Sequence, residues 1–386
     1  MSVRWHILTP ELPPECGGVG DYSAQVASAL AASGDDVTVY CPPAESAWNA
    51  PSGVEVVMLG DRFGMRSVND LTRRLDRDRA ARMLVQYVPS VYGRRGNNLA
   101  FCRWLQSRSR IGTDVRIMFH EPYLYLRWRP DHVVTAFTQR AMAATLVDAA
   151  THLYLSTDTW RRYLARFGAA GVEDAITLPI PSAIPCVDAN HAVRAMRATS
   201  AGHATHLIGH FGSYGNHVAT PLRRALKDLL TADSAVAALC VGRGSDRFVA
   251  QFIADNLPLR GRVTATGRAS AHDVSVQLQA CDVLIQPFPD GVTTRRTSVM
   301  AGLANGRAVV TINGKLTEEV WRSTGSVALV APADPFALSH AVRELLADVD
   351  ARHALEARAS ATYNAAFALH HTIEGLQADS LALSAS

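Results

Sequence analysis

The stretch VLIQPFPDGVTTRRTSVMAGLANGRAVVTI, residues 283–312, combines two short apolar runs with a polar loop and an apolar helical segment between them. The runs over residues 283–287 and 308–312 have the length of strands and are rich in Val and Ile. The helical segment between them ends near Ala304. Two strands joined by a helix form a parallel βαβ unit, so this stretch predicts an α/β domain built on a parallel sheet.

The same alternation of strands and helices runs through the whole chain. Further strands are predicted over residues 5–9, 37–40, 54–59, 83–88, 115–119, 153–155, 207–211, 235–241, 263–265 and 327–330. Residues 178–185 contain three prolines and are expected to be an extended connector. We therefore predict two doubly wound, Rossmann-like domains that face each other across a cleft. Their predicted bounds are a first domain over 1–180, a linker over 181–200, a second domain over 201–365, and a C-terminal helix and tail over 366–386.

Composition narrows the classes of function. Of the 386 residues, 48% are hydrophobic and 19% charged, which excludes a mainly disordered or collagen-like chain. The formal net charge of +3 is too small to indicate nucleic-acid binding. Only Lys227 and Lys315 are lysines, so arginines or backbone N–H groups are expected to bind any phosphate. The six cysteines are widely spaced and indicate reduced thiols, and no apolar run approaches the ~18 residues of a membrane span, so we expect a cytoplasmic protein.

A glycine-rich loop, CGGVGDY over residues 16–22, lies between the first predicted strand and the first helix. Glycines allow a ligand to approach the backbone closely, and the helix N-terminus attracts anions. The loop is therefore a candidate site for a diphosphate or a sugar, with a ligand-free turn as the alternative. Its G-G-x-G spacing differs from that of a dinucleotide site, and no acidic residue ends the next strand.

Two further places carry candidate chemistry. His120 and Glu121 follow the strand over 115–119, where a histidine can bind a sugar hydroxyl or move a proton, or be purely structural. Residues 290–298 (DGVTTRRTS) combine threonine hydroxyls, two arginines and the start of a helix, which predicts an anion pocket rather than a merely capped helix. Glycine-containing loops after three other strands, over 209–215, 242–245 and 267–268, are expected at the same sheet edge.

One pair of carboxylates has the spacing of a metal site. Asp76 and Asp78 form an Asp-x-Asp sequence, but they lie in the charged run over residues 73–82. We expect that run to be a solvated helix face, so no metal site is predicted from it.

In these motifs the chain resembles a GT-B glycosyltransferase, and its second half is similar to the retaining type called family 4, or glycosyltransferase group 1. The stretches that carry the resemblance are GGVGDY (17–22), FHE (119–121), LPIPS (178–182), FGSY (211–214), VGRGS (241–245), TGRAS (266–270), QPFPDGVTTRRTS (286–298) and GRAVVT (306–311). The resemblance implies two Rossmann-like domains, with a nucleotide-diphospho-sugar bound mainly by the second domain and the acceptor mainly by the first. It also implies that no metal and no other cofactor is essential.

The resemblance also implies roles for individual residues. The loop over 17–20 would lie near the donor phosphates and sugar, His120 would contact the transferred sugar, and residues 293–297 would bind the diphosphate. The family's two glutamates, spaced E-x7-E, correspond here to Thr293 and Ala301, so Asp290 is the candidate replacement for the first. The family's Arg/Lys donor pair is likewise not evident around residues 211–222, where Asn216 and His217 stand, so Arg295 and Arg296 are the candidates for the phosphate role.

We therefore predict a glycosyltransferase that moves a sugar from a nucleotide-diphospho-sugar to a hydroxyl of a small-molecule, glycan or lipid-linked acceptor. Retention follows from the resemblance alone, whereas an inverting reaction would need a base such as Asp21 or Glu121. A nucleotide-sugar epimerase of the same fold and a catalytically silent nucleotide-sugar-binding protein are the alternatives. The predicted catalytic residues are His120, Asp290 and Asp21. The predicted donor-binding residues are Gly17, Gly18, Gly20, Gly212, Arg243, Gly267, Arg268, Thr293, Thr294, Arg295, Arg296 and Thr297, and the predicted acceptor-binding residues are Glu121 and Tyr87.

Overall fold

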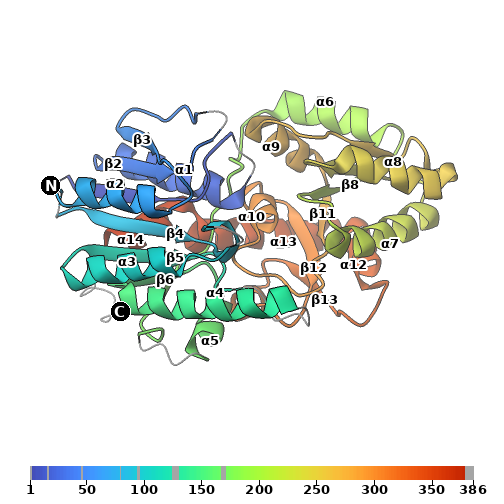
Figure 1. Ribbon diagram of the computed structural model, residues 1–386. Helices are drawn as coiled ribbons and strands as arrows, with labels where there is room; N and C mark the ends of the chain where they lie inside the picture. Colours follow the sequence, from blue (N-terminus) through green and yellow to red (C-terminus); the bar gives the residue numbers. More distant parts are fainter. Residues whose placement is uncertain are drawn as a thin grey trace. The chain divides into compact units, whose positions relative to one another are not determined.

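The computed structural model describes residues 2–14, 17–44, 47–78, 80–93, 96–123, 130–166 and 171–378, with the backbone alone for 130–132. The chain forms two compact units (Figure 1). The first consists of Met1–Ile180 together with Leu369–Ser386, and the second of Pro181–Ala368. We call them unit 1 and unit 2.

Unit 1 is built on a seven-stranded sheet in the order β3-β2-β1-β4-β5-β6-β7. All neighbouring strands in it are parallel. Its strands are β1 (Arg4–Leu8), β2 (Asp36–Cys41), β3 (Val54–Met58), β4 (Arg82–Tyr87), β5 (Asp114–Phe119), β6 (His152–Leu155) and β7 (Ile176–Thr177). Its helices are α1 (Gly18–Ala32), α2 (Met65–Leu75), α3 (Leu99–Arg110), α4 (Pro130–Ala149), α5 (Thr159–Ala165) and α14 (Leu369–Gln377), with a 3-10 turn at Pro89–Val91.

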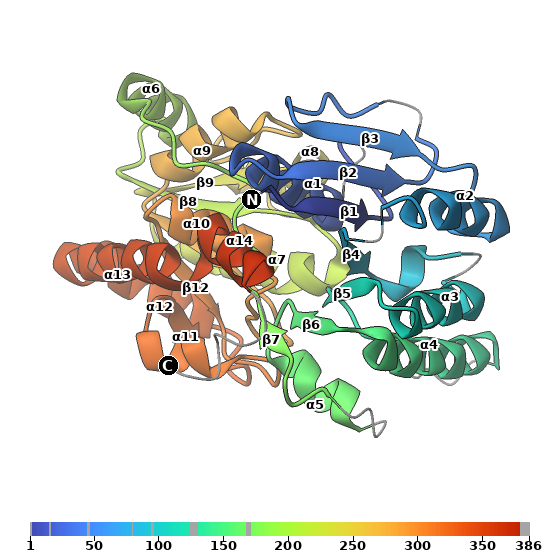
Figure 2. The same ribbon diagram turned by 90° about the vertical axis from the view of Figure 1, so that its left-hand side faces the viewer.

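Helices cover both faces of this sheet. Helices α1 and α14 lie on one face, and α2, α3 and α4 lie on the other (Figure 2). Apolar side chains of α1 and α14 pack with Trp5, Ile7 and Val39, and those of α2, α3 and α4 belong to a second core. Successive strand residues point to opposite faces, which is why the strands are apolar along most of their length. The strand order reverses direction between β1 and β4, which makes that edge the switch point where open α/β sheets bind ligands.

Unit 2 repeats the plan with a six-stranded parallel sheet in the order β10-β9-β8-β11-β12-β13. Its strands are β8 (His206–Phe211), β9 (Val236–Val241), β10 (Val263–Ala265), β11 (Val283–Gln286), β12 (Ala308–Ile312) and β13 (Ala328–Val330). Its helices are α6 (Asn190–Ala201), α7 (Asn216–Ala232), α8 (Ser245–Asp255), α9 (Ala271–Ala280), α10 (Thr297–Ala304), α11 (Glu319–Thr324), α12 (Ala337–Ala347) and α13 (Val349–Thr362), with a 3-10 turn at Leu257–Leu259 and a π-helical turn at Tyr363–Phe367.

Two cores sandwich the sheet of unit 2. Strand β9 is buried along its whole length, with Ala238 and Cys240 facing α7, α8 and α12, and Ala237 and Leu239 facing α9 and α10. The switch point of this sheet lies between β8 and β11. Helix α6 packs on α9 and on β8 and β9, and unit 2 includes the whole stretch 181–200 that was predicted as a linker.

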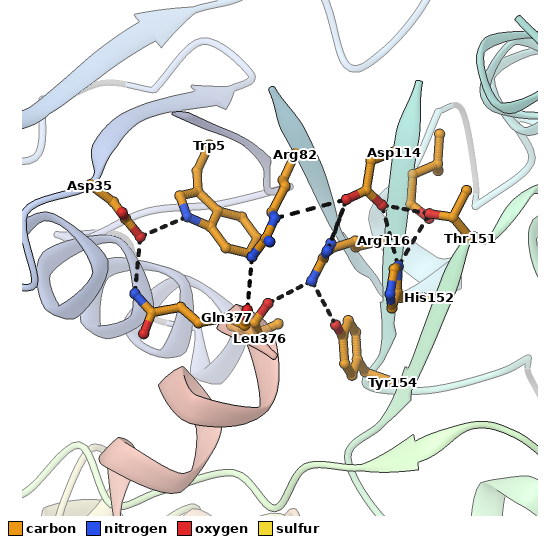
Figure 3. Close-up of polar contacts among 11 residues, drawn as sticks. Trp5, Asp35, Arg82, Asp114, Arg116, Thr151, His152, Tyr154, Leu376 and Gln377 are labelled. Carbon is orange, nitrogen blue, oxygen red and sulfur yellow. Dashed lines mark hydrogen bonds and ion pairs between the residues drawn. The ribbon is translucent and has the colours of Figure 1, made fainter. Parts of the chain in front are cut away.

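Two arginines of the unit 1 sheet bind the carboxyl end of the C-terminal helix α14 (Figure 3). Arg116, which is fully buried, donates a hydrogen bond of 2.6 Å to the carbonyl of Leu376, and Arg82 donates one of 3.1 Å to the carbonyl of Gln377. Cations at this end of a helix satisfy its last carbonyls and offset its dipole. The side chain of Gln377 also donates to Asp35, at 3.0 Å.

Asp114 balances the charge of Arg116 within this network. Its carboxylate accepts hydrogen bonds from Arg116 at 2.9 Å and from Thr151 at 2.6 Å, and His152 lies 3.3 Å away. Burial by itself would raise the pKa of Asp114, but the hydrogen bonds from His152, Arg116 and Thr151 outweigh burial and lower it. The buried arginine is therefore compensated by a carboxylate that stays ionised.

The charged run over residues 73–82 differs from the predicted solvated helix face. Helix α2 ends at Leu75, and the two aspartates that follow it are engaged in ion pairs. Asp76 pairs with Arg108, and Asp78 lies 3.0 Å from Arg4 and 3.2 Å from His6. Both aspartates of this Asp-x-Asp sequence therefore form ion pairs within unit 1.

Candidate functional site

In unit 2 the loops after β8, β9 and β10 interlock through glycines at the carboxyl edge of the sheet. The N–H of Gly212 donates to the carbonyl of Val241 at 3.2 Å, that of Gly242 to the carbonyl of Gly267 at 3.1 Å, and that of Gly267 to the Ser245 hydroxyl at 2.9 Å. Gly242 has a φ of +107°, and a Cβ there would stand 2.7 Å from the carbonyl oxygen of Gly212. Only glycine therefore fits where these two loops approach each other. The hydrogen bonds hold the three predicted donor loops side by side.

The loop between β11 and α10 brings Asp290, Arg296 and His217 together. Arg296 Nη2 donates to both carboxylate oxygens of Asp290, at 2.9 and 2.8 Å, and its guanidinium lies 4.3 Å from the ring centroid of Phe288. His217, at the start of α7, has Nε2 3.2 Å from Asp290 Oδ1. Helix α10 begins at Thr297 with Arg296 as its N-cap, so both arginines of the predicted anion pocket precede the helix.

Thr293 and Thr294 lie inside the same loop. Both are almost fully buried, and the Thr293 hydroxyl has no hydrogen-bond partner among the described residues. Thr294 donates its N–H and its hydroxyl to the carboxylate of Glu318, the latter at 3.2 Å. Sequence reasoning missed Glu318, although it follows the strand over 308–312 and the rule used for the other loops would have found it.

Gly212 lies beside the start of α10. A Cβ on Gly212 would be 3.6 Å from Cβ of Ser298, whose hydroxyl donates to Gln286 Oε1 at 3.1 Å. The Gln286 amide donates in turn to the carbonyl of Phe211 at 3.0 Å, which ties β8 to β11 at the switch point. The candidate donor site of unit 2 therefore lies along the carboxyl edge of its sheet. Gly212, Gly267 and the loop before α10 all belong to it.

Two further predicted donor residues, Arg243 and Arg268, directly follow Gly242 and Gly267 of the interlocked loops. Arg268 follows Gly267 and is exposed. Arg243 lines a cavity together with residues of the loop after β8, of α7 and of α8, and no residue of the 290–298 loop lines it.

In unit 1 the glycine-rich loop meets a carboxylate that sequence reasoning missed. Glu11 Oε1 accepts a hydrogen bond of 3.2 Å from the N–H of Gly20, and a Cβ on Gly17 would fall on the Glu11 carboxylate. The hydroxyl of Thr9 donates to the Glu11 carbonyl at 3.0 Å and lies 2.8 Å from the Ser23 hydroxyl. The Glu11 carboxylate therefore lies at the N-terminus of α1. The sequence predicted a diphosphate or a sugar at this position.

The remaining parts of that loop agree with the predicted strand–loop–helix order. Gly18 is the first residue of α1, and a Cβ on it would contact nothing within 4 Å. Asp21 lies in the first turn of α1, is exposed, and donates its N–H to the Gly17 carbonyl at 3.1 Å. Cys16 lies outside the described residues.

His120 follows β5 at the carboxyl edge of the unit 1 sheet. Its Nε2 lies 2.8 Å from Oε1 of the fully buried Gln86, and its ring meets Tyr22 edge to face with centroids 5.1 Å apart. Its carbonyl accepts from the Trp160 indole at 2.9 Å. The ring is thus held in one orientation, with Glu121 next to it in the chain.

Tyr87 is placed differently from the predicted acceptor contact. Its ring is 1% exposed and packs in the core against Tyr92 and Phe119, with centroids 5.7 and 5.0 Å apart. The side chain points to the face of the sheet that α2, α3 and α4 cover, because β4 continues its alternation up to Tyr87. Tyr87 is therefore a core residue of unit 1, and its role in binding the acceptor stays a prediction.

Comparison with known proteins agrees with this architecture. Residues 205–348 match the family model of glycosyl transferases group 1. Unit 2 thus contains a domain that matches the glycosyl transferases group 1 model. No curated protein matches the chain by sequence. The predicted resemblance and the predicted enzyme class are confirmed by this domain.

Solved structures of low identity share the fold over the full chain. Sucrose-phosphate synthase from Thermosynechococcus elongatus is 15% identical, with a TM-score of 0.73 and 97% of each chain covered. WaaG, a glycosyltransferase involved in lipopolysaccharide biosynthesis, is 17% identical, with a TM-score of 0.68, covering 97% of this chain and 100% of that one. Anabaena HepE, solved with UDP and glucose, is 15% identical with a TM-score of 0.69, covering 97% and 98%. The predicted GT-B fold, with two parallel sheets flanked by helices, is confirmed.

The described part of the chain lacks two features. None of its helices has the length and the apolar character that crossing a membrane requires. Within the same residues, no three His, Cys, Asp or Glu side chains lie together as a possible metal site. Metal independence stays a prediction.

Proposed function

We propose that the glycosyl transferases group 1 domain binds a nucleotide-diphospho-sugar and that the chain transfers its sugar to an acceptor hydroxyl, with retention and without a metal. The observation that carries the proposal is the Thr293 hydroxyl, which is buried and lacks a partner among the described residues. A buried hydroxyl without a hydrogen bond costs free energy, and a bound phosphate oxygen at the start of α10 would satisfy it.

The difficult step is departure of the nucleoside diphosphate, which gains negative charge as the glycosidic bond to the sugar breaks. The loop before α10 offers a hydroxyl, a helix N-terminus and the guanidinium of Arg296 to that charge. Asp290 holds Arg296 in place by two hydrogen bonds, so the arginine is oriented before the donor binds. Asp290 would then position Arg296 and contact the sugar with its remaining hydrogen-bonding capacity.

In unit 1, Glu11 favours a sugar over a phosphate at the glycine-rich loop. Its carboxylate already accepts the Gly20 N–H and would repel a second anion. A carboxylate accepts hydrogen bonds from sugar hydroxyls, as does a histidine ring nitrogen. We therefore assign the transferred sugar to Glu11 and His120, and the diphosphate to unit 2.

A donor panel tests the proposal. UDP-glucose is the first donor to try because HepE, which shares the fold, was solved with it. Thermal shift and calorimetry report binding, and release of nucleoside diphosphate with and without acceptors reports transfer, in the presence and absence of a chelator. Isomerised donor without acceptor would indicate an epimerase, and tight binding without turnover for every donor and acceptor would indicate a silent binding protein. Loss of turnover with the chelator, restored by Mg²⁺ or Mn²⁺, would contradict metal independence.

A matched pair of variants tests the site itself. Thr293→Val removes the unpartnered hydroxyl at nearly constant volume, and we expect the thermal midpoint to be kept while affinity for the nucleoside diphosphate falls about tenfold. Thr311→Val is the control, because Thr311 on β12 is equally buried and its hydroxyl also lacks a described partner. Equal affinities of the two variants for the nucleoside diphosphate would show that the loop before α10 is not part of the site.

A further inference from the structure

The loop after β12, residues 313–318, lies directly against the loop before α10. The N–H of Leu316 donates to the carbonyl of Asp290 at 2.8 Å, and the N–H of Glu318 donates to the carbonyl of Val292 at 3.4 Å. The two bonds advance by two residues on each loop, so they continue the parallel pairing of β11 with β12 beyond the strand ends. We call residues 313–318 the β12 loop, and its backbone supports the backbone of the loop before α10.

Glycines allow the two loops to approach this closely. A Cβ on Gly314 would clash with the carbonyl carbon of Asp290, and a Cβ on Gly291 would lie 2.6 Å from the amide nitrogen of Thr317. Gly291 also has a φ of +108°, which favours glycine on its own account. Because backbone meets backbone here, a shift of one loop would displace the other.

Glu318 adds a side-chain contact to this support. It is the N-cap residue of α11, yet its side chain accepts no hydrogen bond from that helix. It turns to Thr294 instead, and accepts hydrogen bonds from the N–H and from the hydroxyl of that residue, the latter at 3.2 Å. An acidic N-cap residue commonly accepts from the first turn of its own helix. This carboxylate therefore binds a residue of the loop before α10 in place of capping α11.

Thr293 lies between two residues that the β12 loop holds. On one side, the N–H of Val292 donates to the Thr317 hydroxyl at 3.3 Å. On the other side, Thr294 donates its N–H and its hydroxyl proton to Glu318, whereas binding an ionised phosphate oxygen needs a donor. The buried Thr293 hydroxyl has no partner among the described residues, so of the two threonines it is the one that can donate to a phosphate.

We propose that Glu318 is a positioning residue of the candidate donor site. By holding Thr294 it fixes the backbone next to Thr293 and so orients the Thr293 hydroxyl toward the diphosphate, while Thr294 itself makes no contact with the donor. A carboxylate accepts stronger hydrogen bonds than an amide, so Glu318 restrains Thr294 more firmly than a glutamine would. The inference rests on the proposed function, because it needs a diphosphate at the loop before α10.

Calorimetry with nucleoside diphosphates tests the role of Glu318. UDP, GDP, ADP and dTDP are titrated into the wild-type chain, and the one that binds most tightly is used for every variant, at a temperature well below each thermal midpoint. Glu318→Gln keeps the size of the side chain but weakens its hold on Thr294, so we expect affinity to fall about fivefold or more. The control is Glu319→Gln, which changes the exposed neighbour and should keep affinity within about twofold of the wild type.

Combined variants separate positioning from a purely structural contact. Thr294→Val removes the hydroxyl and should lower affinity, whereas Thr294→Ser keeps the hydroxyl and should restore it. Because Thr294 acts through Glu318, Thr294→Val should add no further loss to Glu318→Gln. Because both act through the Thr293 hydroxyl, Glu318→Gln should add no further loss to Thr293→Val. A contact that only stabilises the fold would lower the thermal midpoint and leave the affinities unchanged.

The outcomes that overturn the inference differ from those that overturn the proposed function. If none of the four diphosphates binds the wild-type chain, the proposed function fails and the inference with it. If one binds and Glu318→Gln binds it as tightly, the inference alone fails. It also fails if the losses of Thr294→Val and Glu318→Gln add, which would place Thr294 in contact with the diphosphate. Should Glu318→Gln not fold, the comparison of Thr294→Val with Thr294→Ser tests the same contact from its other side, and equal affinities in that pair would overturn the inference.

Discussion

Arg296 and Asp290 are joined by two hydrogen bonds, at 2.9 and 2.8 Å, six residues apart on one loop. The sequence predicted different roles for them, with the arginine binding the diphosphate and the aspartate acting as a catalytic residue. In the structure they form one charge-paired element, with both side chains about four-fifths buried. The net charge that this element presents to a bound diphosphate is therefore close to zero until the ligand competes with Asp290 for the guanidinium.

Replacing Asp290 with Asn should strengthen product binding and weaken catalysis. The amide removes the negative charge that competes for Arg296, so we expect affinity for the nucleoside diphosphate to rise several-fold. Turnover should fall because the arginine loses its second hydrogen bond and the sugar loses a carboxylate. Calorimetry and product-release rates measure the two effects, and Glu319→Gln, which removes an exposed charge from the same unit, is the control. A lower diphosphate affinity in Asp290→Asn would contradict this account.

His210 should make unit 2 sensitive to acid. Burial lowers the pKa of His210 to about 4 against the hydrogen bonds of the Ile285 and Ser213 carbonyls, which raise it. Below its ordinary pKa of 6.5 the unfolded chain binds a proton that the folded chain does not, so the free energy of unfolding falls from about pH 6.5 down to about pH 4. The full loss is about 3 kcal/mol.

The variant His210→Gln isolates this effect, since glutamine does not titrate. We expect its unfolding free energy to change less between pH 6.5 and pH 4 than that of the wild type, whatever its absolute stability. Denaturant unfolding at several pH values gives both slopes. Identical slopes would show that other groups account for the acid sensitivity.

Arg116 should hold α14 on unit 1. Arg116→Ala leaves the Leu376 carbonyl without its charged donor and Asp114 without its buried partner, which costs about 3 kcal/mol or more. Trp321 is the single tryptophan of unit 2, so in a Trp321→Phe background the fluorescence follows unit 1 alone. We expect the unfolding transition of unit 1 to shift to lower denaturant in Arg116→Ala and to stay in place in the control Arg103→Ala, which alters an exposed position of α3. Equal transitions would mean that packing alone retains the helix.

The order and type of most elements could be predicted because each strand is an apolar run of the right length followed by a loop and an amphipathic segment. Strand β9, for example, starts one residue after its predicted start and ends where predicted, at Val241. The two-residue β7 was missed, because two residues carry no periodicity. The docking of α14 was also out of reach, since Arg116 and Leu376 are 260 residues apart in the chain.

The sequence predicted which strand ends carry the candidate residues better than it predicted which groups those residues contact. Reasoning from strand ends found Gly212, Gly267, His120 and the loop before α10, because carboxyl ends of parallel strands share an edge. It missed that Glu11 reaches the first turn of α1, since this contact depends on how the loop after β1 folds back. Loop geometry is set by contacts distant in sequence, and periodicity does not report it.

Glu11 gives the sharpest test of how the ligand divides between the units. If the glycine-rich loop faces the sugar, Glu11→Gln should lower kcat/KM about tenfold or more, because the amide is a poorer acceptor for sugar hydroxyls than the carboxylate. Affinity for the nucleoside diphosphate should stay within twofold, since the diphosphate is assigned to unit 2. The stability loss should be small, about 0.5–2 kcal/mol, as for other residues that cap a helix N-terminus. Steady-state kinetics and calorimetry on the same protein separate the two readouts, and Glu173→Gln, an exposed carboxylate of unit 1, is the control. If the diphosphate binds Glu11→Gln more than about fivefold tighter, the carboxylate was repelling a phosphate at α1, and the sugar assignment fails.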